Sequence, residues 1–226
     1  MNQQNQRLYS RSRLWAYCFA ICLGSLQFGY ALGIYNPLSK FLMAIYHYKC
    51  GDCWDVHKHR EPLNTIVNTA LAVGALLGAT FSHCFMKDRR LCGIYAYCIF
   101  CMVGSALYLV MSLPTLIAAR ILHGFGAGGF SHLVPIMVYE ISPPAMRVGT
   151  GYLFQVTVNF GIMLASLFAF GLPSNIESVY LDEWMWRVII ICPICVGGFM
   201  LVIFATIYRM DTPVVYLKED NLQKAR

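Results

Sequence analysis

The highest density of side chains that can bind a metal or form a disulfide lies in one short stretch, HYKCGDCWDVHKH, at positions 47–59. Cysteine thiolates and histidine imidazoles at such short spacing can bind Zn²⁺ in a tetrahedral site. On an oxidising side of a membrane, Cys50 and Cys53 can instead form a disulfide. Because a second CxxC is missing, free side chains or partner contacts are a third interpretation. The candidate zinc ligands are His47, Cys50, Cys53, His57 and His59.

The sequence offers no pattern typical of an enzyme. It shows no nucleophile paired with a base and no phosphate-binding loop. The glycine-rich run 124–129 lies inside an apolar segment, without the strand, turn and helix that a nucleotide site requires. We therefore expect no catalytic activity and no cofactor, with zinc in the 47–59 stretch kept as the alternative described above.

Long apolar segments must position any functional site. Of the 226 residues, 58% are hydrophobic and 12% are charged, which is typical of a polytopic membrane protein. A helix needs about 20 apolar residues to cross a bilayer. Such segments occupy residues 14–34, 63–86, 91–111, 114–138, 148–172 and 187–210. The predicted fold is an all-α membrane protein with six transmembrane helices. Its predicted parts are a basic tail 1–13, a helical bundle 14–210 that includes a long outer loop 36–62, and a polar tail 211–226.

Basic residues gather at one end of the predicted spans. Both tails and the turns near residues 87–90 and 147 carry most of the Lys and Arg, so the positive-inside rule places both termini on the cytoplasmic or matrix side. This bias, with attraction to anionic lipid headgroups, accounts for the net charge of +6. The expected partner is the lipid bilayer, and nucleic acid is excluded.

The beginning of the chain bears on the choice of membrane. The first fifty residues contain no Asp or Glu, and Arg7, Arg11 and Arg13 occur among serines. This composition is shared by mitochondrial targeting segments, although ordinary basic flanking of a first helix is the favoured explanation. We predict an integral membrane protein, with the mitochondrial inner membrane favoured over the plasma membrane.

Glycines spaced four residues apart recur in the apolar segments. Such spacing lets helix backbones approach closely, so these positions predict helix–helix contacts. The pairs are Gly29 and Gly33, Gly74 and Gly78, and Gly124 and Gly128.

Several segments follow the order of a known transporter family. Residues 24–37 read GSLQFGYALGIYNP, residues 119–143 read ARILHGFGAGGFSHLVPIMVYEISP, and residues 143–162 read PPAMRVGTGYLFQVTVNFGI. They resemble the first, fourth and fifth helices of sugar transporters of the major facilitator superfamily, and Trp186 with Arg187 resembles the start of the sixth. The resemblance implies the N-terminal six-helix half of a glucose-transporter-like fold.

The chain departs from this family at its charged motifs. The basic turn after the second helix, which sets the inward gate in the family, is shortened here. Ala31 occupies the position of the acid found in proton-coupled members. The resemblance implies an inner-side charge network that clasps helices together. Its candidate members are Asp88, Arg89, Arg90, Glu140 and Arg147.

The resemblance also implies where a solute would bind. Gln155 matches a fifth-helix glutamine that contacts sugar in the family, and Gln27 and Asn159 are expected on neighbouring polar faces. Each of them can equally join helices through hydrogen bonds. Arg120 either contacts a solute or ion, or packs against backbone carbonyls, and the second is favoured because a buried charge is costly. Interior hydrogen bonds are expected for Asn64, Asn68, His123 and His132.

Two functions stay open. Carriers of this superfamily bind substrate between two six-helix halves, and this chain contains one. The first hypothesis is a sugar-transporter-derived, non-transporting accessory subunit of a larger complex, whose partners are other membrane protein subunits. The alternative is a transporter of a hexose-like or other small solute, working as a homodimer or with a second half-chain. The weakened charged motifs favour the first hypothesis.

Overall fold

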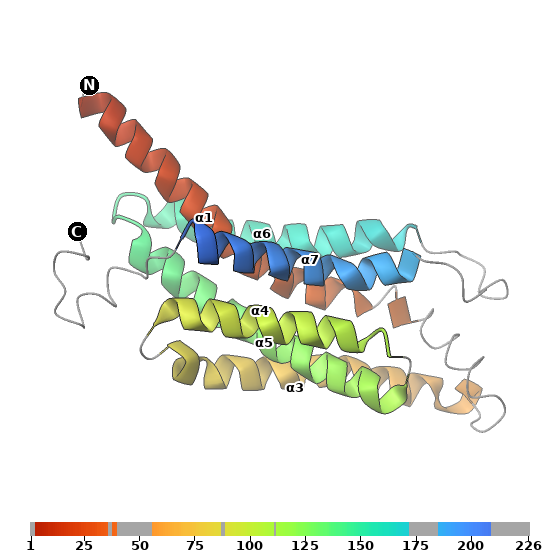
Figure 1. The fold of residues 1–226 in the computed structure, drawn as a ribbon. Coiled ribbons are helices and arrows are strands. Elements are labelled where there is room, and N and C mark those ends of the chain that lie inside the picture. The colour runs from red at the N-terminus through yellow and green to blue at the C-terminus, as the bar shows by residue number, and fades with distance from the viewer. Residues whose placement is uncertain are drawn as a thin grey trace.

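The computed structural model describes residues 3–35, 38–39, 56–86, 89–110, 112–171 and 185–208. Over these residues the chain forms six long helices and no strand (Figure 1). Each helix is long and apolar enough to cross a membrane, which confirms the predicted all-α, six-span fold. The helices are α1 (Gln3–Gly33), α3 (Val56–Met86), α4 (Arg90–Leu107), α5 (Leu113–Ile141), α6 (Arg147–Ala169) and α7 (Met185–Thr206).

Two helices are longer than the predicted spans. α1 begins at Gln3 instead of residue 14, and α3 begins at Val56 instead of residue 63. Their apolar parts, Arg11–Gly33 and Asn64–Met86, agree with the prediction. Hydropathy marks only the part of a helix that crosses hydrocarbon, whereas its backbone hydrogen bonds can continue into water. The predicted outer segment 36–62 therefore includes the first turns of α3.

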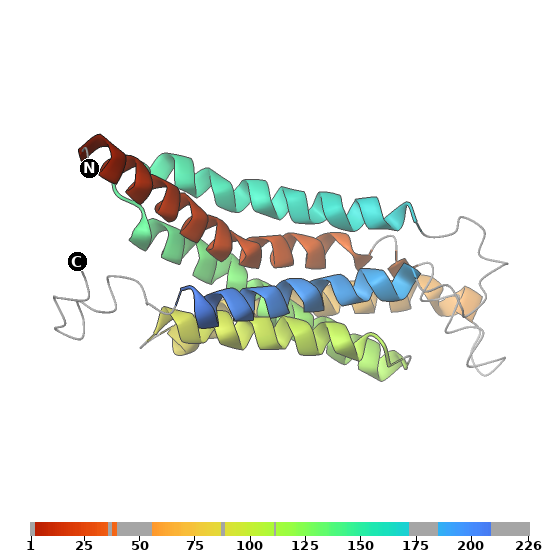
Figure 2. The same ribbon diagram turned by 45° about the horizontal axis from the view of Figure 1, so that its top comes forward.

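The helices form two layers. α6, α1, α5 and α3 lie in one layer, and α7 and α4 pack across α1 and α5 on one side of it (Figure 1 and Figure 2). The beginning of α1 and the end of α7 lie at the same end of the bundle (Figure 1). We call this the inner end and the opposite one the outer end. The side of the membrane that each end faces stays a prediction.

Glycines let two helix pairs approach backbone to backbone. A Cβ atom at Gly74 of α3 would overlap the carbonyl oxygen of Ile121 in α5. A Cβ atom at Gly29 of α1 would likewise overlap the carbonyl oxygen of Val158 in α6. The glycine spacing thus predicted real helix contacts, of the kind that join helices where lipid supplies no hydrophobic drive.

The buried core has two large clusters along the bundle and a small third one formed by Ala31, Leu71 and Ala127. The inner cluster is rich in sulfur and aromatic rings and includes Cys98, Cys101, Phe130, Met137 and Phe204. The outer cluster is rich in tyrosine and includes Tyr30, Tyr35, Tyr108, Trp186 and Ile189. Cys98 and Cys101 are free and buried, where a thiol packs as a small apolar side chain.

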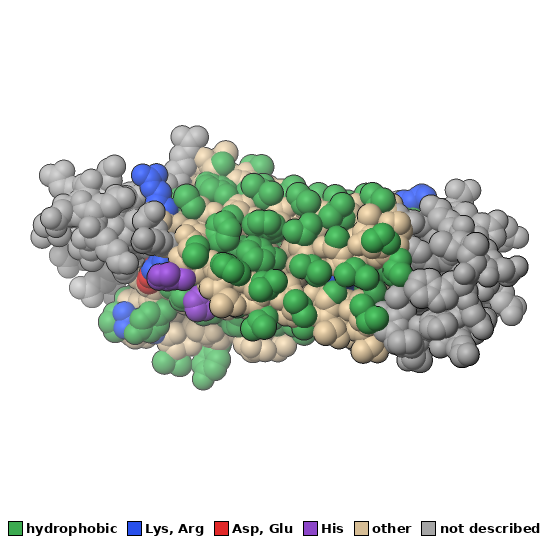
Figure 3. Space-filling view, turned by 90° about the horizontal axis from the view of Figure 1, so that it is seen from below, with side chains coloured by type: hydrophobic (Ala, Val, Ile, Leu, Met, Phe, Trp, Pro, Cys, Tyr) green, Lys and Arg blue, Asp and Glu red, His purple; other side chains and the backbone are tan. Residues whose placement is uncertain are grey.

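Large hydrophobic side chains also cover the outside of the bundle. Leu76 of α3 is 69% exposed and Val202 of α7 is 60% exposed. In Figure 3, hydrophobic side chains cover the middle of the visible face, and charged side chains and histidines lie toward its ends. An apolar belt between charged ends is what a bilayer requires.

Candidate functional site

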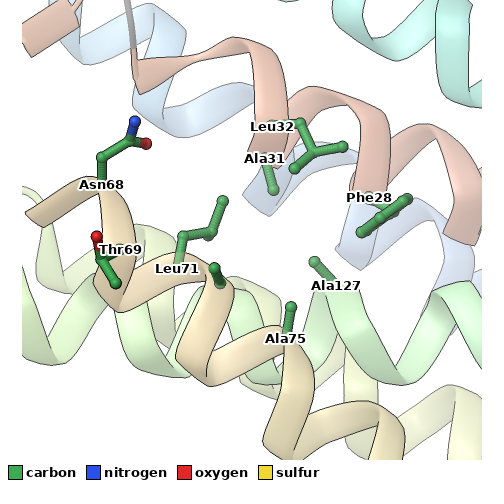
Figure 4. A pocket seen from close by; sticks show the side chains of 9 residues that line it. Phe28, Ala31, Leu32, Asn68, Thr69, Leu71, Ala75 and Ala127 are labelled. Atoms are coloured by element: carbon green, nitrogen blue, oxygen red, sulfur yellow. The ribbon is translucent and has the colours of Figure 1, made fainter. Parts of the chain in front are cut away.

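A pocket of about 320 Å³ lies between α1, α3 and α5 (Figure 4). Small side chains leave this space open, and Asn68 and Thr69 of α3 supply polar groups at one end of it. Its volume is at the lower end of the range of small-molecule sites. The other main lining residues are Phe28, Ala31, Leu32, Ala75 and Ala127.

The pocket lies on the side of α1 that is turned away from α7. Gln27 Nε2 donates to the Pro193 carbonyl at 2.7 Å, and Tyr30 Oη donates to the Ile189 carbonyl at 2.7 Å. Both bonds place α7 beside the 27 and 30 positions of α1. With 3.6 residues per turn, the pocket-lining residues Phe28 and Leu32 project from another side of α1.

Gln155 and Asn159 lie on this same side of the layer. Both side chains are exposed on α6, with Gln155 Nε2 3.5 Å from Asn159 Oδ1. Leu164 of α6 packs against the outer cluster, which contains Ile189 of α7. Helical periodicity places Gln155 and Asn159 roughly opposite Leu164 on α6. We call this surface, with the pocket and the two amides, the open face.

Gln27 lies apart from the open face. Its side chain is fully buried and bonded to α7, and its Oε1 has no hydrogen-bond partner among the described residues. Pro193 has no N–H to donate to the Ile189 carbonyl one turn earlier, and the Tyr30 hydroxyl takes that place. Gln27 and Tyr30 thus join α1 to a helix interrupted by proline. This geometry separates Gln27 from Gln155.

Arg120 of α5 is fully buried and holds three helices together. Its Nε donates to the Val67 carbonyl at 3.3 Å, and its Nη1 lies 3.5 Å from the Ala31 carbonyl. Its Nη2 donates to Asn68 Oδ1 at 3.2 Å. The guanidinium carbon lies 4.2 Å from the centre of the Tyr35 ring, within cation–π range. The favoured interpretation, packing against carbonyls, agrees with this geometry.

Arg120 is also adjacent to the pocket. Ala31 and Asn68, which accept hydrogen bonds from the guanidinium, line the pocket as well. Figure 4 shows the Asn68 amide at the opposite end from Phe28. The guanidinium and the pocket therefore share these two residues as neighbours.

The structure gives mixed outcomes for the remaining polar residues. Asn68 makes its predicted interior hydrogen bond by accepting from Arg120. His123 is buried as predicted, and neither ring nitrogen is paired among the described residues, so its hydrogen bond stays a prediction. For His132 the prediction was wrong, because this residue is exposed. Sequence spacing alone does not distinguish a lipid-facing position of α5 from an interior one, since this helix is apolar on all sides.

Part of the predicted charge network forms at the inner end. Arg90 Nη2 and Glu140 Oε1 form an ion pair at 2.8 Å, and Arg90 Nη1 donates to the Met86 carbonyl at 2.7 Å. Arg147 instead stacks on the Tyr139 ring at 4.2 Å and donates to the Ser142 carbonyl at 3.3 Å. The network therefore divides into two separate contacts, which involve the neighbouring residues Glu140 and Tyr139 at the end of α5.

The structure describes few contacts of the other predicted site residues. Arg89 is exposed, and Asp88 lies outside the described residues. His47, Cys50 and Cys53 lie outside them too, and for His57 and His59 only their place in α3 is described. The zinc and disulfide hypotheses for this stretch stay predictions.

Tyr35 and Tyr108 were not found by sequence reasoning. Both are buried beside Arg120, yet neither belongs to a charged or metal-ligand pattern. The usable signal was their position, since each stands at the outer end of an apolar segment, as Arg120 does.

The bundle has the fold of one half of a major facilitator superfamily transporter. It superimposes on the proton:xylose symporter XylE bound to 6-bromo-6-deoxy-D-glucose with a TM-score of 0.80, covering 95% of this chain and 48% of that chain at 17% identity. An inward-open xylose transporter XylE from E. coli gives a TM-score of 0.77, with 52% of that chain covered at 18% identity.

Sequence comparison establishes the family. Residues 17–226 match the family described as "Sugar (and other) transporter", and the chain belongs to it. It is 24% identical to Hexose transporter 1 of Plasmodium yoelii yoelii over 93% of this chain and 43% of that protein. It is 28% identical to Hexose transporter 1 of Toxoplasma gondii over 90% of this chain and 38% of that protein. The chain therefore spans less than half the length of these relatives.

Proposed function

We propose that this chain provides one half of a carrier for a hexose-like solute, and that the solute contacts the open face. The observation that carries the proposal is the pair of exposed amides, Gln155 and Asn159, in the middle of an apolar spanning helix. Amides that face hydrocarbon are costly. Their surface therefore suits contact with protein or with a water-filled solute path.

A second six-helix unit is needed to complete such a carrier. In this superfamily substrate lies between two halves related by an axis along the membrane normal. The relatives named hexose transporter are more than twice as long as the matched region. The missing unit can come from a second copy of the chain, from another chain or from further sequence. The open face is the surface it would meet.

Solute uptake in proteoliposomes tests the proposal. Labelled hexose is offered to the protein in its native assembly, as wild type and as Gln155→Ala. We expect the substitution to abolish uptake, because an amide hydrogen bond to a sugar hydroxyl is lost at the centre of the path. The matched control is Val156→Ala, which changes the next residue, 60% exposed, on the same helix. Normal uptake by Gln155→Ala would refute the assignment of the open face.

A second candidate function is a non-transporting subunit of a larger membrane complex. This function is favoured by the burial of Arg120 and Gln27, because both side chains are hydrogen-bonded to other helices of the bundle and neither is exposed to a solute. Native mass and composition of gently solubilised protein distinguish the two. A particle of two chains of 25.5 kDa supports the carrier, and recovery with unrelated membrane subunits supports the accessory role.

The membrane that holds the protein is part of the same proposal. The absence of acids in the first fifty residues, with Arg7, Arg11 and Arg13, supports the mitochondrial inner membrane. Fractionation of cells that express a C-terminally tagged chain tests this. Co-purification with plasma membrane in place of mitochondria would overturn it.

A further inference from the structure

Buried polar atoms without partners gather around Arg120. The hydroxyl of Tyr35 and both ring nitrogens of His123 have no hydrogen-bond partner among the described residues, and the hydroxyl of Tyr108 makes at most a weak contact, with the Arg120 side chain. All three side chains are at most 4% exposed. Such unpaired groups are rare in native interiors and point to a missing partner.

These groups converge on one place in the outer cluster. The Arg120 guanidinium carbon lies 4.2 Å from the centre of the Tyr35 ring. The rings of Tyr108 and His123 are edge to face, with centroids 6.1 Å apart. Tyr108 and His123 both interact electrostatically with Arg120. We call these four residues the Arg120 cluster.

No acidic side chain that the structure describes lies near the Arg120 cluster. Among the side chains that the structure describes, Glu140 is the acidic one, and it pairs with Arg90. It stands twenty residues beyond Arg120 on the same helix, which is about 30 Å at 1.5 Å per residue. Carbonyl and amide dipoles surround Arg120 instead. These neutral dipoles disperse the charge but do not cancel it, so a small anion beside the guanidinium would gain a favourable electrostatic interaction.

The chemistry of the unpaired groups favours an anion. Tyrosine hydroxyls and an imidazole N–H can all donate hydrogen bonds, as the guanidinium does. Water would satisfy the hydroxyls but would not neutralise the charge. The pocket offers an approach, because Asn68 lines it and accepts from Arg120 Nη2. We propose that the Arg120 cluster binds a monovalent anion no larger than a carboxylate group.

Thermal unfolding of the complete chain in a mild detergent tests this. Sodium chloride, sodium formate and sodium gluconate are compared at equal ionic strength, gluconate being too large for the cluster. We expect chloride or formate to raise Tm by a few degrees with saturation in the millimolar range. Saturation by chloride identifies a free inorganic anion, and an effect of formate alone identifies the carboxylate of an organic ligand. Equal Tm values in all three salts would overturn the proposal.

Variants locate the anion. Tyr35→Phe combined with Tyr108→Phe removes two donors and keeps both rings, so we expect the apparent affinity to fall at least about tenfold. Tyr97→Phe is the matched control, because Tyr97 is buried in the inner cluster and its hydroxyl is also unpaired. Its anion response should equal that of the wild type. An unchanged response in the double variant would place the anion elsewhere and refute the site. No step of this test depends on transport.

Discussion

The positive charges of the two arginines that join helices are balanced differently, one by a carboxylate and the other by neutral groups. Arg90, at the inner end, forms an ion pair with Glu140, and the two side chains are 15% and 12% exposed. Arg120 is fully buried and meets carbonyls, an amide and an aromatic ring. Near water an ion pair forms at little desolvation cost. In the interior, a full carboxylate would itself have to be desolvated, so neutral dipoles share the charge.

The largest expected effect comes from removing the interior arginine. Arg120→Ala leaves a cavity among α1, α3 and α5 and removes three hydrogen bonds, so we expect a loss of about 3 kcal/mol in the free energy of unfolding. Denaturant unfolding in detergent measures it. Arg120→Met sharpens the comparison, because it fills the volume without charge. Full stability in the methionine variant would show that packing, and not the guanidinium, holds the helices.

A neutral donor to a backbone carbonyl should matter less. Tyr30→Phe leaves the Ile189 carbonyl without its side-chain partner, opposite a proline that cannot donate. We expect a loss of about 1–2 kcal/mol, typical of a buried group left unpaired. Tyr97→Phe is the control, because its hydroxyl has no partner among the described residues. Equal stability changes in the two variants would contradict a specific role for Tyr30.

The inner ion pair should have the smallest effect. Glu140→Gln removes the carboxylate but leaves Arg90 bonded to the Met86 carbonyl. We expect a loss of at most about 1 kcal/mol, because the pair lies partly in solvent. A double-mutant cycle with Arg90→Gln isolates the pair, and its coupling should weaken as salt is raised. A coupling as large as the effect of Arg120→Ala would reverse the comparison.

Local patterns in the sequence predicted the parts of the fold that depend on local physics. Apolar length predicted the six spans, and the spacing of Gly29 and Gly74 predicted close helix contacts. The ends of α1 and α3 were missed because polar residues can continue a helix into water. Gln155 and Asn159 were correctly grouped because they stand one turn apart on one helix.

The rest of the site depends on contacts between distant segments. Whether Gln27 faces α7 or the open face is decided by Pro193, 166 residues away. The grouping of Tyr35 and Tyr108 around Arg120 likewise requires three helices to be packed together. No spacing rule within one segment contains this information.

The contact between α1 and α6 has a consequence for how the protein is made. Ser25 and Thr157, which are hydrogen-bonded across this contact, are 132 residues apart. At about 5–20 residues per second, roughly 7 to 26 s of translation separate them. During that interval the surface of α1 around Gly29, which later contacts α6, faces lipid or the insertion machinery. The first helix is therefore inserted before its partner, the fifth helix, exists, and mutations on this surface should act first on biogenesis.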